Sequence, residues 1–218
     1  MSHLKHLQSK VKSLDELLEQ TKQWKSEGQN VVFTNGCFDI LHRGHVEYLA
    51  QAADLGDKLV LGLNTDDSVR RQNKSPERPI NNEEARATVL AALEFIHAIV
   101  FFDDDTPFAL IEQVKPDTLV KGGDYDPNET DPNAKQYIVG SDVVRSNGGT
   151  VSIIELVPNF STTSTIEKLR GWRLFGCTIG KRISPLQQLS PIENSFPHGL
   201  PAKTECENEE LCITFARS

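Results

Sequence analysis

Two histidines, His42 and His45, stand three residues apart with Gly44 between them, and this spacing suits the binding of phosphate. An imidazole can donate a hydrogen bond to a phosphate oxygen, or carry a positive charge near neutral pH. A glycine beside the second histidine lets a phosphate approach the backbone closely. A His-x-x-His pair alone is common by chance, and either ring could simply lie in solvent at the start of a helix.

The sequence around the pair favours phosphate binding. The apolar run that begins at Val31 is rich in β-branched residues and predicts a buried strand, which Gly36 ends. From Gly44 onwards, the apolar residues recur at helical spacing. A strand, a tight turn and the start of a helix together aim free backbone N–H groups at an anion.

The composition excludes several classes of protein. The chain has 218 residues and a net charge of −8, with 23 Lys and Arg against 31 Asp and Glu, so we expect no nucleic-acid or membrane partner. No apolar run reaches the roughly 18–20 residues that span a bilayer, and the polar N-terminus is not a signal peptide. Only Cys37 among four cysteines lies in the first 170 residues, so we expect no disulfide framework and a cytoplasmic location.

Short apolar runs alternate with helical patterns along residues 1–170, which is typical of an α/β domain. We expect a Rossmann-like parallel five-stranded sheet in the order 3-2-1-4-5, with helices on both faces. The strands are predicted at 31–35, 59–63, 98–102, 117–121 and 150–156. Residues 171–218 show no useful periodicity and predict a largely disordered tail.

Ligands of such sheets bind beyond the carboxyl ends of the strands, where the strand order switches, here between the first and fourth strands. Four segments should converge at that edge: 34–45, 64–66, 121–124 and 161–163. Residues 70–79 are polar and basic and follow the second strand. We expect them to form a loop that is mobile without nucleotide and closes when nucleotide binds.

The motifs that are absent narrow the chemistry. The sequence has neither the Gly-x-Gly-x-x-Gly of dinucleotide-binding enzymes nor the Gly-x-x-x-x-Gly-Lys-Ser/Thr of P-loop proteins. Histidines, basic residues and a helix start suit nucleotidyl transfer, in which a phosphate oxygen attacks the α-phosphorus of a nucleoside triphosphate. That reaction needs positioning and charge neutralisation and no protein nucleophile.

The run Thr-Asn-Gly-Cys-Phe-Asp-Ile-Leu-His-Arg-Gly-His over 34–45 resembles the signature of the HxGH nucleotidyltransferases, the cytidylyltransferase-like superfamily. Residues 12–170 look like the heptose 1-phosphate adenylyltransferases of that superfamily, on the further runs 64–66, 78–80, 120–125, 147–149 and 161–163. The resemblance implies that ATP and a sugar 1-phosphate, D-glycero-β-D-manno-heptose 1-phosphate in that family, give an ADP-sugar and pyrophosphate with Mg²⁺. It also implies a homo-oligomer, a dimer. Many relatives carry a fused sugar kinase; since nothing precedes the domain here, we expect one activity.

The resemblance assigns roles to individual residues. The implied catalytic residues are His42, His45 and Lys74. The implied nucleotide-binding residues are Thr34, Asn35, Gly36, Phe38, His42, His45, Asp66, Arg78, Arg86, Lys121, Gly122, Ser161, Thr162 and Thr163. Those implied to bind the acceptor substrate are Asp39, Gly123 and Asp124, and no protein ligand to a metal is assigned.

Several of these residues also have a structural interpretation. Arg86 could pair with Glu83 on the same helix, and Thr162 could only cap a helix. Lys74 could be a solvated charge, and Asp39 could stabilise a turn. Cys37, next to a strand end, is expected to be a packed side chain and not a nucleophile.

Two alternative functions remain open. Residues 156–163 lack the arginine of the Arg-Thr-x-Gly-Ile-Ser-Thr-Thr run of the related glycerol-phosphate cytidylyltransferases, which favours ATP over CTP. A cytidylyltransferase acting on another acceptor, such as glycerol 3-phosphate, is one alternative. A non-catalytic nucleotide-binding module is the other, although a pure binder has no need of charge at a leaving group.

Overall fold

The computed structural model describes residues 2–172 except 74 and 159. The tail expected from residue 171 therefore lies outside the described residues from 173 onwards. Within the described part of the chain, no helix is long and apolar enough to cross a membrane.

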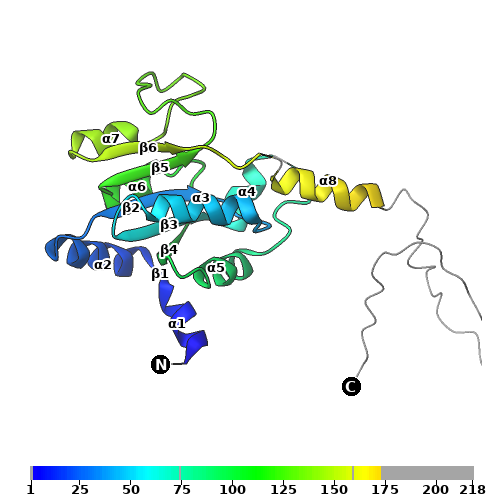
Figure 1. The fold of residues 1–218 in the computed structure, drawn as a ribbon, viewed down its shortest axis with the longest axis horizontal. Helices are drawn as coiled ribbons and strands as arrows, with labels where there is room; N and C mark the ends of the chain where they lie inside the picture. The colour runs from blue at the N-terminus through cyan, green and yellow to red at the C-terminus, as the bar shows by residue number, and fades with distance from the viewer. Residues whose placement is uncertain (1, 74, 159, 173–218) are drawn as a thin grey trace, which may run out of the picture. The chain divides into compact units, whose positions relative to one another are not determined.

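One parallel sheet forms the centre of the fold, in the order β1-β4-β3-β2-β5-β6 (Figure 1). The strands are β1 (Val11–Lys12), β2 (Val31–Gly36), β3 (Lys58–Asn64), β4 (Ile96–Phe102), β5 (Thr118–Gly122) and β6 (Thr150–Ile154). The five predicted strands have the predicted order, as β4-β3-β2-β5-β6. The prediction of five strands was nevertheless one too few, because β1 also pairs with β4. A strand of two residues is too short to show a period in the sequence.

The strands alternate with eight helices over the described residues, as the sequence predicts for an α/β fold. They are α1 (His3–Lys10), α2 (Leu14–Ser26), α3 (Arg43–Ala53), α4 (Asp66–Arg71), α5 (Glu83–Ala91), α6 (Phe108–Val114), α7 (Ser141–Ser146) and α8 (Thr162–Trp172). Helices α1 and α4 were not predicted from the sequence. Each has a capping residue, because the side chains of Ser2 and Thr65 accept hydrogen bonds from backbone N–H groups three residues on.

Local capping explains where two of the predicted helices begin. Ser13 and Glu16 form the reciprocal capping box at the start of α2. Asn82 accepts a hydrogen bond from the N–H of Ala85 at 2.8 Å, and Glu83 and Glu84 follow in the first turn of α5. Acidic side chains in the first turn stabilise a helix, because their negative charge lies near the positive end of the helix dipole.

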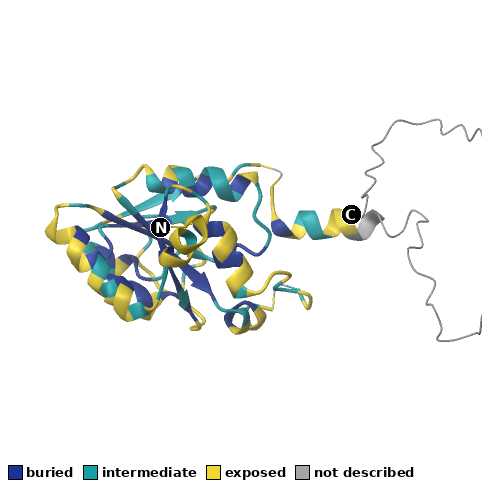
Figure 2. Ribbon diagram, turned by 90° about the horizontal axis from the view of Figure 1, so that it is seen from below, coloured by how far each residue is buried: buried dark blue, intermediate teal, exposed yellow. Residues whose placement is uncertain are grey.

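Two apolar clusters cover the opposite faces of the sheet, so the strands lie buried between layers of helices (Figure 2). One cluster packs α3 and α5 on the sheet, through Leu49 and Leu90 among others. The other packs α2, α6 and α7, through residues that include Leu17, Ile111 and Val144. The prediction of helices on both faces is confirmed, and both layers leave the carboxyl ends of the strands accessible.

The expected basic loop over 70–79 is shorter than predicted. Arg70 and Arg71 belong to α4, where Arg70 pairs with Asp67 at 2.6 Å. Arg71 donates to Asp105 at 2.8 Å and also bonds the backbone of Asp103. The connection to α5 therefore begins at residue 72, and the two arginines are held by carboxylates on the surface.

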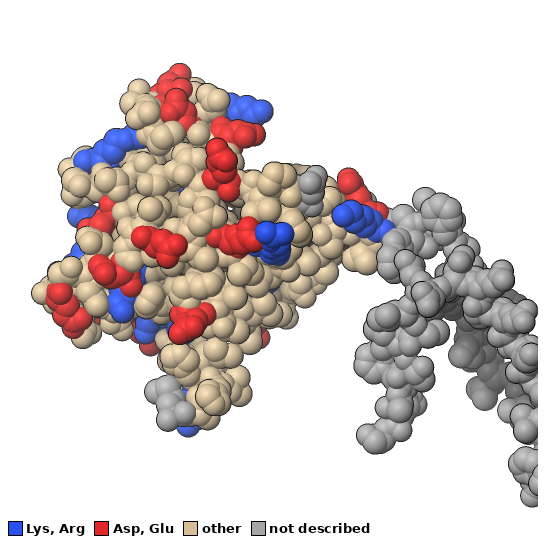
Figure 3. All heavy atoms as spheres, in the orientation of Figure 1, with Lys and Arg blue, Asp and Glu red and all other residues tan. Residues whose placement is uncertain are grey.

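Charged side chains of both signs are interspersed on the face seen in Figure 3. The visible acidic groups lie over several elements among uncharged side chains. Any charge that binds phosphate must therefore be concentrated locally, at the site described next.

Candidate active site

A cavity of about 660 Å³ opens at the carboxyl edge of the sheet, where β2, β3 and β5 end. It lies at the predicted switch point, because β2 pairs with β3 on one side and with β5 on the other. Its lining includes the predicted residues Asn35, Gly36, Phe38, His42, His45, Arg78, Lys121, Gly122, Ser161, Thr162 and Thr163. The four segments expected at this edge thus all reach one cavity, with Asn64 contributed by the second of them.

Other predicted site residues are not part of this lining. Thr34, Asp39, Asp66 and Arg86 lie behind or beside the wall, and Gly123 and Asp124 follow the lining residue Gly122. Lys74 lies outside the described residues.

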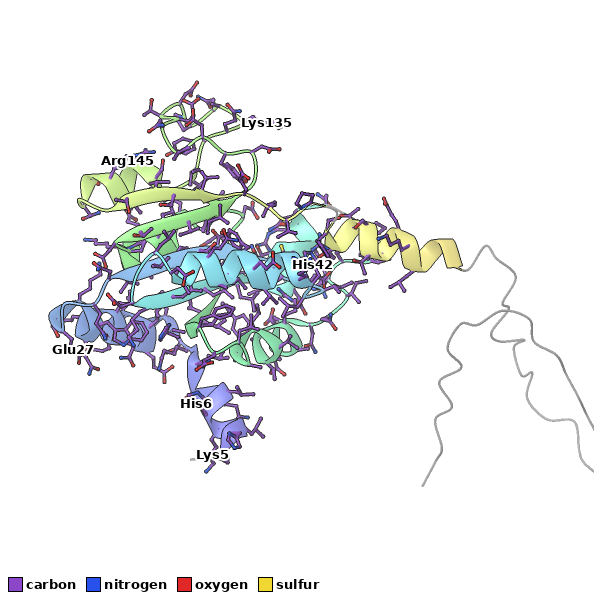
Figure 4. All side chains as sticks on the ribbon, viewed as in Figure 1. Lys5, His6, Glu27, His42, Lys135 and Arg145 are labelled. Carbon is purple, nitrogen blue, oxygen red and sulfur yellow. The ribbon has the colours of Figure 1, made fainter. Side chains whose placement is uncertain are left out.

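The histidine pair forms a stacked unit at the start of α3. Figure 4 labels His42 at that end of the helix. The two rings have centroids 3.8 Å apart and planes 14° from parallel. His42 is the N-cap residue, and its Nδ1 accepts a hydrogen bond from the backbone N–H of His45 at 3.3 Å. Because Nδ1 accepts, the neutral ring of His42 carries its proton on Nε2, where it can be donated.

Two ring nitrogens of the pair are buried without a partner. His42 Nε2 and His45 Nδ1 make no hydrogen bond to any described residue. A buried polar atom without a partner costs free energy, so such atoms in a cavity wall indicate a place for a polar ligand. The free N–H groups at the start of α3 favour an anion at the same place.

Both histidines are held in the neutral form. Burial is the first cause that lowers the pKa of His42. Burial also lowers the pKa of His45 to about 4, followed by the neighbouring charges of His42 and Arg78, while a hydrogen bond to the backbone of Ile40 opposes the shift. An arriving anion would reverse this balance, because an opposite charge favours the protonated ring.

Aromatic side chains close the space around the pair. Phe38 packs its ring edge-on against His45, with centroids 5.2 Å apart, and has a positive φ of 44° in the tight turn after β2. Phe160 lies on the other side, with its ring centroid 6.2 Å from that of His42. Gly44 is closely surrounded, because a Cβ there would lie 3.1 Å from Phe160 Cβ and 3.2 Å from His42 Cε1, so a larger side chain would require these neighbours to shift.

Lys121 supplies a positive charge from the end of β5. Its Nζ donates a hydrogen bond to Asn35 Oδ1 at the end of the neighbouring strand β2. Burial lowers the pKa of Lys121 to about 8, because the charged form is desolvated. The ammonium group faces a neutral amide, so much of its charge is left for a ligand.

Arg78 supplies a second positive charge. Its Nε donates to Asp39 Oδ2 at 3.2 Å, and its side chain is 9% exposed at the cavity wall. Asp39 itself is fully enclosed and also accepts hydrogen bonds from the backbone N–H groups of Ile80 and Asn81. The turn interpretation of Asp39 thus matches the contacts in the structure.

Arg86 lies entirely inside the protein and joins three segments. It donates to the carbonyl of Cys37 at 2.7 Å, to the carbonyl of Asn81 at 3.1 Å and to Asp66 Oδ1 at 2.7 Å. The alternative that Arg86 pairs with Glu83 is wrong, since Glu83 accepts from the backbone N–H of Asp66. In the structure Arg86 and Asp66 brace the turn beneath the histidines.

The last helix presents its N-terminus to the cavity. Ser161 caps α8 by accepting a hydrogen bond from the N–H of Ser164 at 3.0 Å. Thr162 and Thr163 begin the helix and line the cavity, so Ser161 and not Thr162 makes the side-chain cap bond. This second helix start adds free N–H groups to those of α3.

Sequence reasoning missed several lining residues. They are Cys37, Tyr48, Gln72, Asp105, Thr106, Pro107, Tyr125, Tyr137, Val139, Leu156, Val157 and Phe160, whereas Gly44 and Asn64 belong to segments that were expected at this edge. Asn64 ends β3 at the predicted edge, so its position was the available signal. Tyr125, Tyr137 and Phe160 come from irregular segments, where no period reveals which side chains turn inward. Cys37 is buried as expected for a packed side chain.

The arrangement suits the handling of a polyphosphate. It combines neutral imidazoles, two cations and two helix starts in one cavity, and the described residues contain no group of three or more His, Cys, Asp or Glu that could hold a metal ion. Such a site can neutralise charge that develops on phosphate oxygens.

Comparison with known proteins agrees with this chemistry. A family model described as cytidylyltransferase-like matches residues 33–168. The bifunctional protein HldE of Methylobacillus flagellatus is 49% identical over 160 residues, which are 73% of this chain and 31% of that protein. HldE of Geotalea uraniireducens is 50% identical over 162 residues, again 31% of its length. The chain therefore spans less than a third of these curated relatives.

Among solved structures, the lipopolysaccharide core biosynthesis protein of Thermoplasma volcanium matches with 28% identity and a TM-score of 0.45. The match covers 60% of this chain and 98% of that one. The family match is the decisive finding, because it covers more than half of the chain and includes the histidine pair. The chain therefore belongs to the cytidylyltransferase-like family and is a nucleotidyltransferase.

Proposed function

We propose that the chain transfers the adenylyl group of ATP to a sugar 1-phosphate, with D-glycero-β-D-manno-heptose 1-phosphate as the expected acceptor. The products are an ADP-sugar and pyrophosphate. The observation that carries the proposal is the pair of unpartnered nitrogens, His42 Nε2 and His45 Nδ1, in the wall of a cavity at a helix start. The resemblance of residues 12–170 to heptose 1-phosphate adenylyltransferases supports the choice of ATP and of the acceptor.

The reaction is an in-line displacement at phosphorus. An oxygen of the acceptor phosphate attacks the α-phosphorus of ATP, and the bond to the oxygen that bridges the α- and β-phosphates breaks. Pyrophosphate leaves with that oxygen. Negative charge therefore grows on the leaving group and on the equatorial oxygens, where hydrogen-bond donors and cations stabilise it.

The roles of individual residues follow from their positions. His42 donates from Nε2 to a phosphate oxygen, and His45 gains a proton as the triphosphate binds beside it. Arg78 stands next to the pair and binds the same phosphates. Lys121 comes from β5 and binds the attacking phosphate, while α8 offers N–H groups from the far wall. Lys74 is kept as a catalytic residue of this proposal.

Mg²⁺ enters the proposal as part of the MgATP substrate. Mg²⁺ prefers oxygen ligands, keeps several waters and commonly binds through substrate phosphates. Phosphate oxygens and water would therefore hold the ion, and the described residues that line the cavity would bind the phosphate oxygens that remain.

The test measures pyrophosphate release from ATP and from CTP with a panel of sugar 1-phosphates and glycerol 3-phosphate. We expect release from ATP with a heptose 1-phosphate, formation of the matching ADP-sugar, and loss of both in His45→Ala. Release only from CTP would replace the proposal by the cytidylyltransferase alternative. No release with any pair would favour a nucleotide-binding module. Light scattering on the same sample tests the proposed dimer.

A further inference from the structure

The carboxylate of Asp39 accepts three hydrogen bonds, all of them from protein groups of residues 78–81. Its side chain is 0% exposed, and Oδ1 accepts from the N–H groups of Ile80 at 2.8 Å and Asn81 at 3.0 Å. Oδ2 accepts from Arg78 Nε at 3.2 Å. Asp39 is also absent from the cavity lining, so the carboxylate does not face a substrate.

Arg78 uses only one of its donors for this contact. The described residues give its two terminal nitrogens no hydrogen bond, and the side chain lines the cavity. Arg78, His42 and His45 line the same cavity, and the charge of Arg78 also contributes to the lowered pKa of His45. A guanidinium has five N–H donors in a fixed fork, so one edge can be held while the other binds an anion.

The segment that carries Arg78 is fixed from two sides. Asn81 Nδ2 donates to the carbonyl of Asp39 at 2.7 Å, so the segment and the turn after β2 are bonded reciprocally. Arg86 donates to the carbonyl of Asn81 at 3.1 Å from beneath. These contacts hold the backbone around Arg78 in place before any ligand is bound.

From these contacts we propose that Asp39 is a positioning residue, which holds the Arg78 guanidinium in the cavity wall for the nucleotide phosphates and does not itself contact substrate. A charged side chain held in advance loses less conformational entropy on binding, and it stabilises the transition state without reorganisation. The implied role of Asp39 in binding the acceptor is replaced by this one. Only the test by turnover depends on the proposed function, because the test by nucleotide affinity does not need the reaction.

The central test is a double-mutant cycle with Asp39→Asn and Arg78→Ala. Asparagine keeps an oxygen for the N–H groups of Ile80 and Asn81 but loses the charge that faces Arg78. We expect each single variant to lower kcat by about tenfold to a hundredfold, the range for the loss of one stabilising donor or of its geometry. Because Asp39 acts through Arg78, the double variant should be no less active than Arg78→Ala alone. Additive losses in the double variant would overturn the proposal, as would normal kinetics in Asp39→Asn.

A matched control is available on the surface. Asp67 and Arg70 form another aspartate–arginine pair at 2.6 Å, but both side chains are well exposed. Asp67→Asn should leave kcat and the KM for ATP unchanged. This comparison separates the loss of a bridging carboxylate at the cavity from the loss of any aspartate in this region.

A second variant covers the case in which Asp39→Asn does not fold. Arg78→Lys leaves Asp39 and its two backbone hydrogen bonds intact and keeps the positive charge. A compact ammonium group paired with Asp39 cannot also reach a phosphate as the planar fork does. We expect Arg78→Lys to be nearly as impaired as Arg78→Ala, and wild-type activity in Arg78→Lys would overturn the bridging role.

Nucleotide affinity separates this inference from the proposed function. The same cycle is measured as the dissociation constant of a non-hydrolysable ATP analogue with a methylene group between the α- and β-phosphorus atoms, in the presence of Mg²⁺. If no sugar phosphate supports turnover but the cycle in affinity is non-additive, the proposed reaction fails and the positioning role stands. If turnover is found and the cycle in affinity is additive, the proposed reaction stands and the positioning role of Asp39 fails.

Discussion

Tyr48 Oη and Thr34 Oγ1 lie 2.6 Å apart beneath the floor of the cavity. Tyr48 also donates to the carbonyl of Val120 at 3.3 Å, so its hydroxyl contacts groups of both strands. Burial raises the pKa of Tyr48 to about 12, which keeps the phenol protonated. One side chain from α3 thereby connects the ends of β2 and β5, the two strands that flank the switch point.

Tyr48→Phe should therefore destabilise the fold more than it impairs catalysis. The substitution leaves the Thr34 hydroxyl and the Val120 carbonyl without their partner, which costs about 1–3 kcal/mol for a buried group. Chemical denaturation measures the loss, and kinetics should show a change in kcat of less than about tenfold. Tyr137→Phe is the control, because its hydroxyl bonds Asp142 at an exposed position. An unchanged free energy of unfolding in Tyr48→Phe would contradict the role given to this bond.

The histidine pair should act mainly on the transition state. His45→Ala and His42→Ala remove groups aimed at charge that develops during the transfer, so kcat should fall by about 10²–10³-fold. The KM for ATP should rise much less, since ground-state binding is shared with other groups. Steady-state kinetics with varied ATP separates the two constants. A variant with near-normal kcat would leave these histidines with a purely structural role.

Nucleotide binding should be coupled to proton uptake at His45. Its pKa of about 4 keeps the ring neutral in the free protein, and a bound triphosphate raises that pKa. The affinity for MgATP should therefore increase as the pH falls from about 7 towards 5, by at most about tenfold per pH unit for one proton. Calorimetry in buffers of different ionisation enthalpy counts the protons, and His45→Gln should remove this uptake. Equal uptake in that variant would assign the proton to another group.

The stability of the free protein should follow the opposite trend. The folded pKa of His45 lies below its ordinary value of 6.5, so the unfolded chain binds more protons between those two values. The free energy of unfolding should fall as the pH drops from about 6.5 to 4, and His45→Gln should flatten this part of the curve. The same ring thus makes acid unfavourable for folding and favourable for nucleotide binding.

The strands and their order could be predicted because β2, β3 and β4 each contain an apolar run, as a sheet covered on both faces requires. The position of the site followed from that order, since strand ends meet at one edge. Strand β1 could not be predicted, because two residues have no periodicity. Helix α1 could not be predicted from apolar spacing either, because its only buried residue is Lys10.

The partners of buried charges could not be predicted from the sequence. Arg86 has Glu83 three residues before it, yet it binds Asp66, which lies 20 residues away, and two backbone carbonyls. Asp39 binds a segment about 40 residues further along the chain. Local spacing reports neighbours on one helix, whereas these contacts depend on how β2, α4 and α5 pack together.

Gly44 allows a test of how closely the position of the His42 ring matters. A Cβ at residue 44 would lie 3.2 Å from His42 Nδ1 and 3.1 Å from Phe160 Cβ, so Gly44→Ala should displace the ring that caps α3. The backbone itself tolerates alanine there, and alanine favours a helix over glycine by about 1 kcal/mol. We therefore expect a melting temperature that is equal or higher, together with a kcat lower by about tenfold to a hundredfold.

A lower kcat together with an equal or higher melting temperature distinguishes a displaced ring from a destabilised fold. Gln51→Ala is the control two turns further along α3, because Gln51 is exposed and is not part of the cavity lining. It should leave kcat unchanged, and denaturation curves measured beside the kinetics give both quantities for each variant. Normal turnover in Gly44→Ala would show that the ring can shift without cost, and a lower melting temperature would mean that the helix and not the ring absorbs the clash.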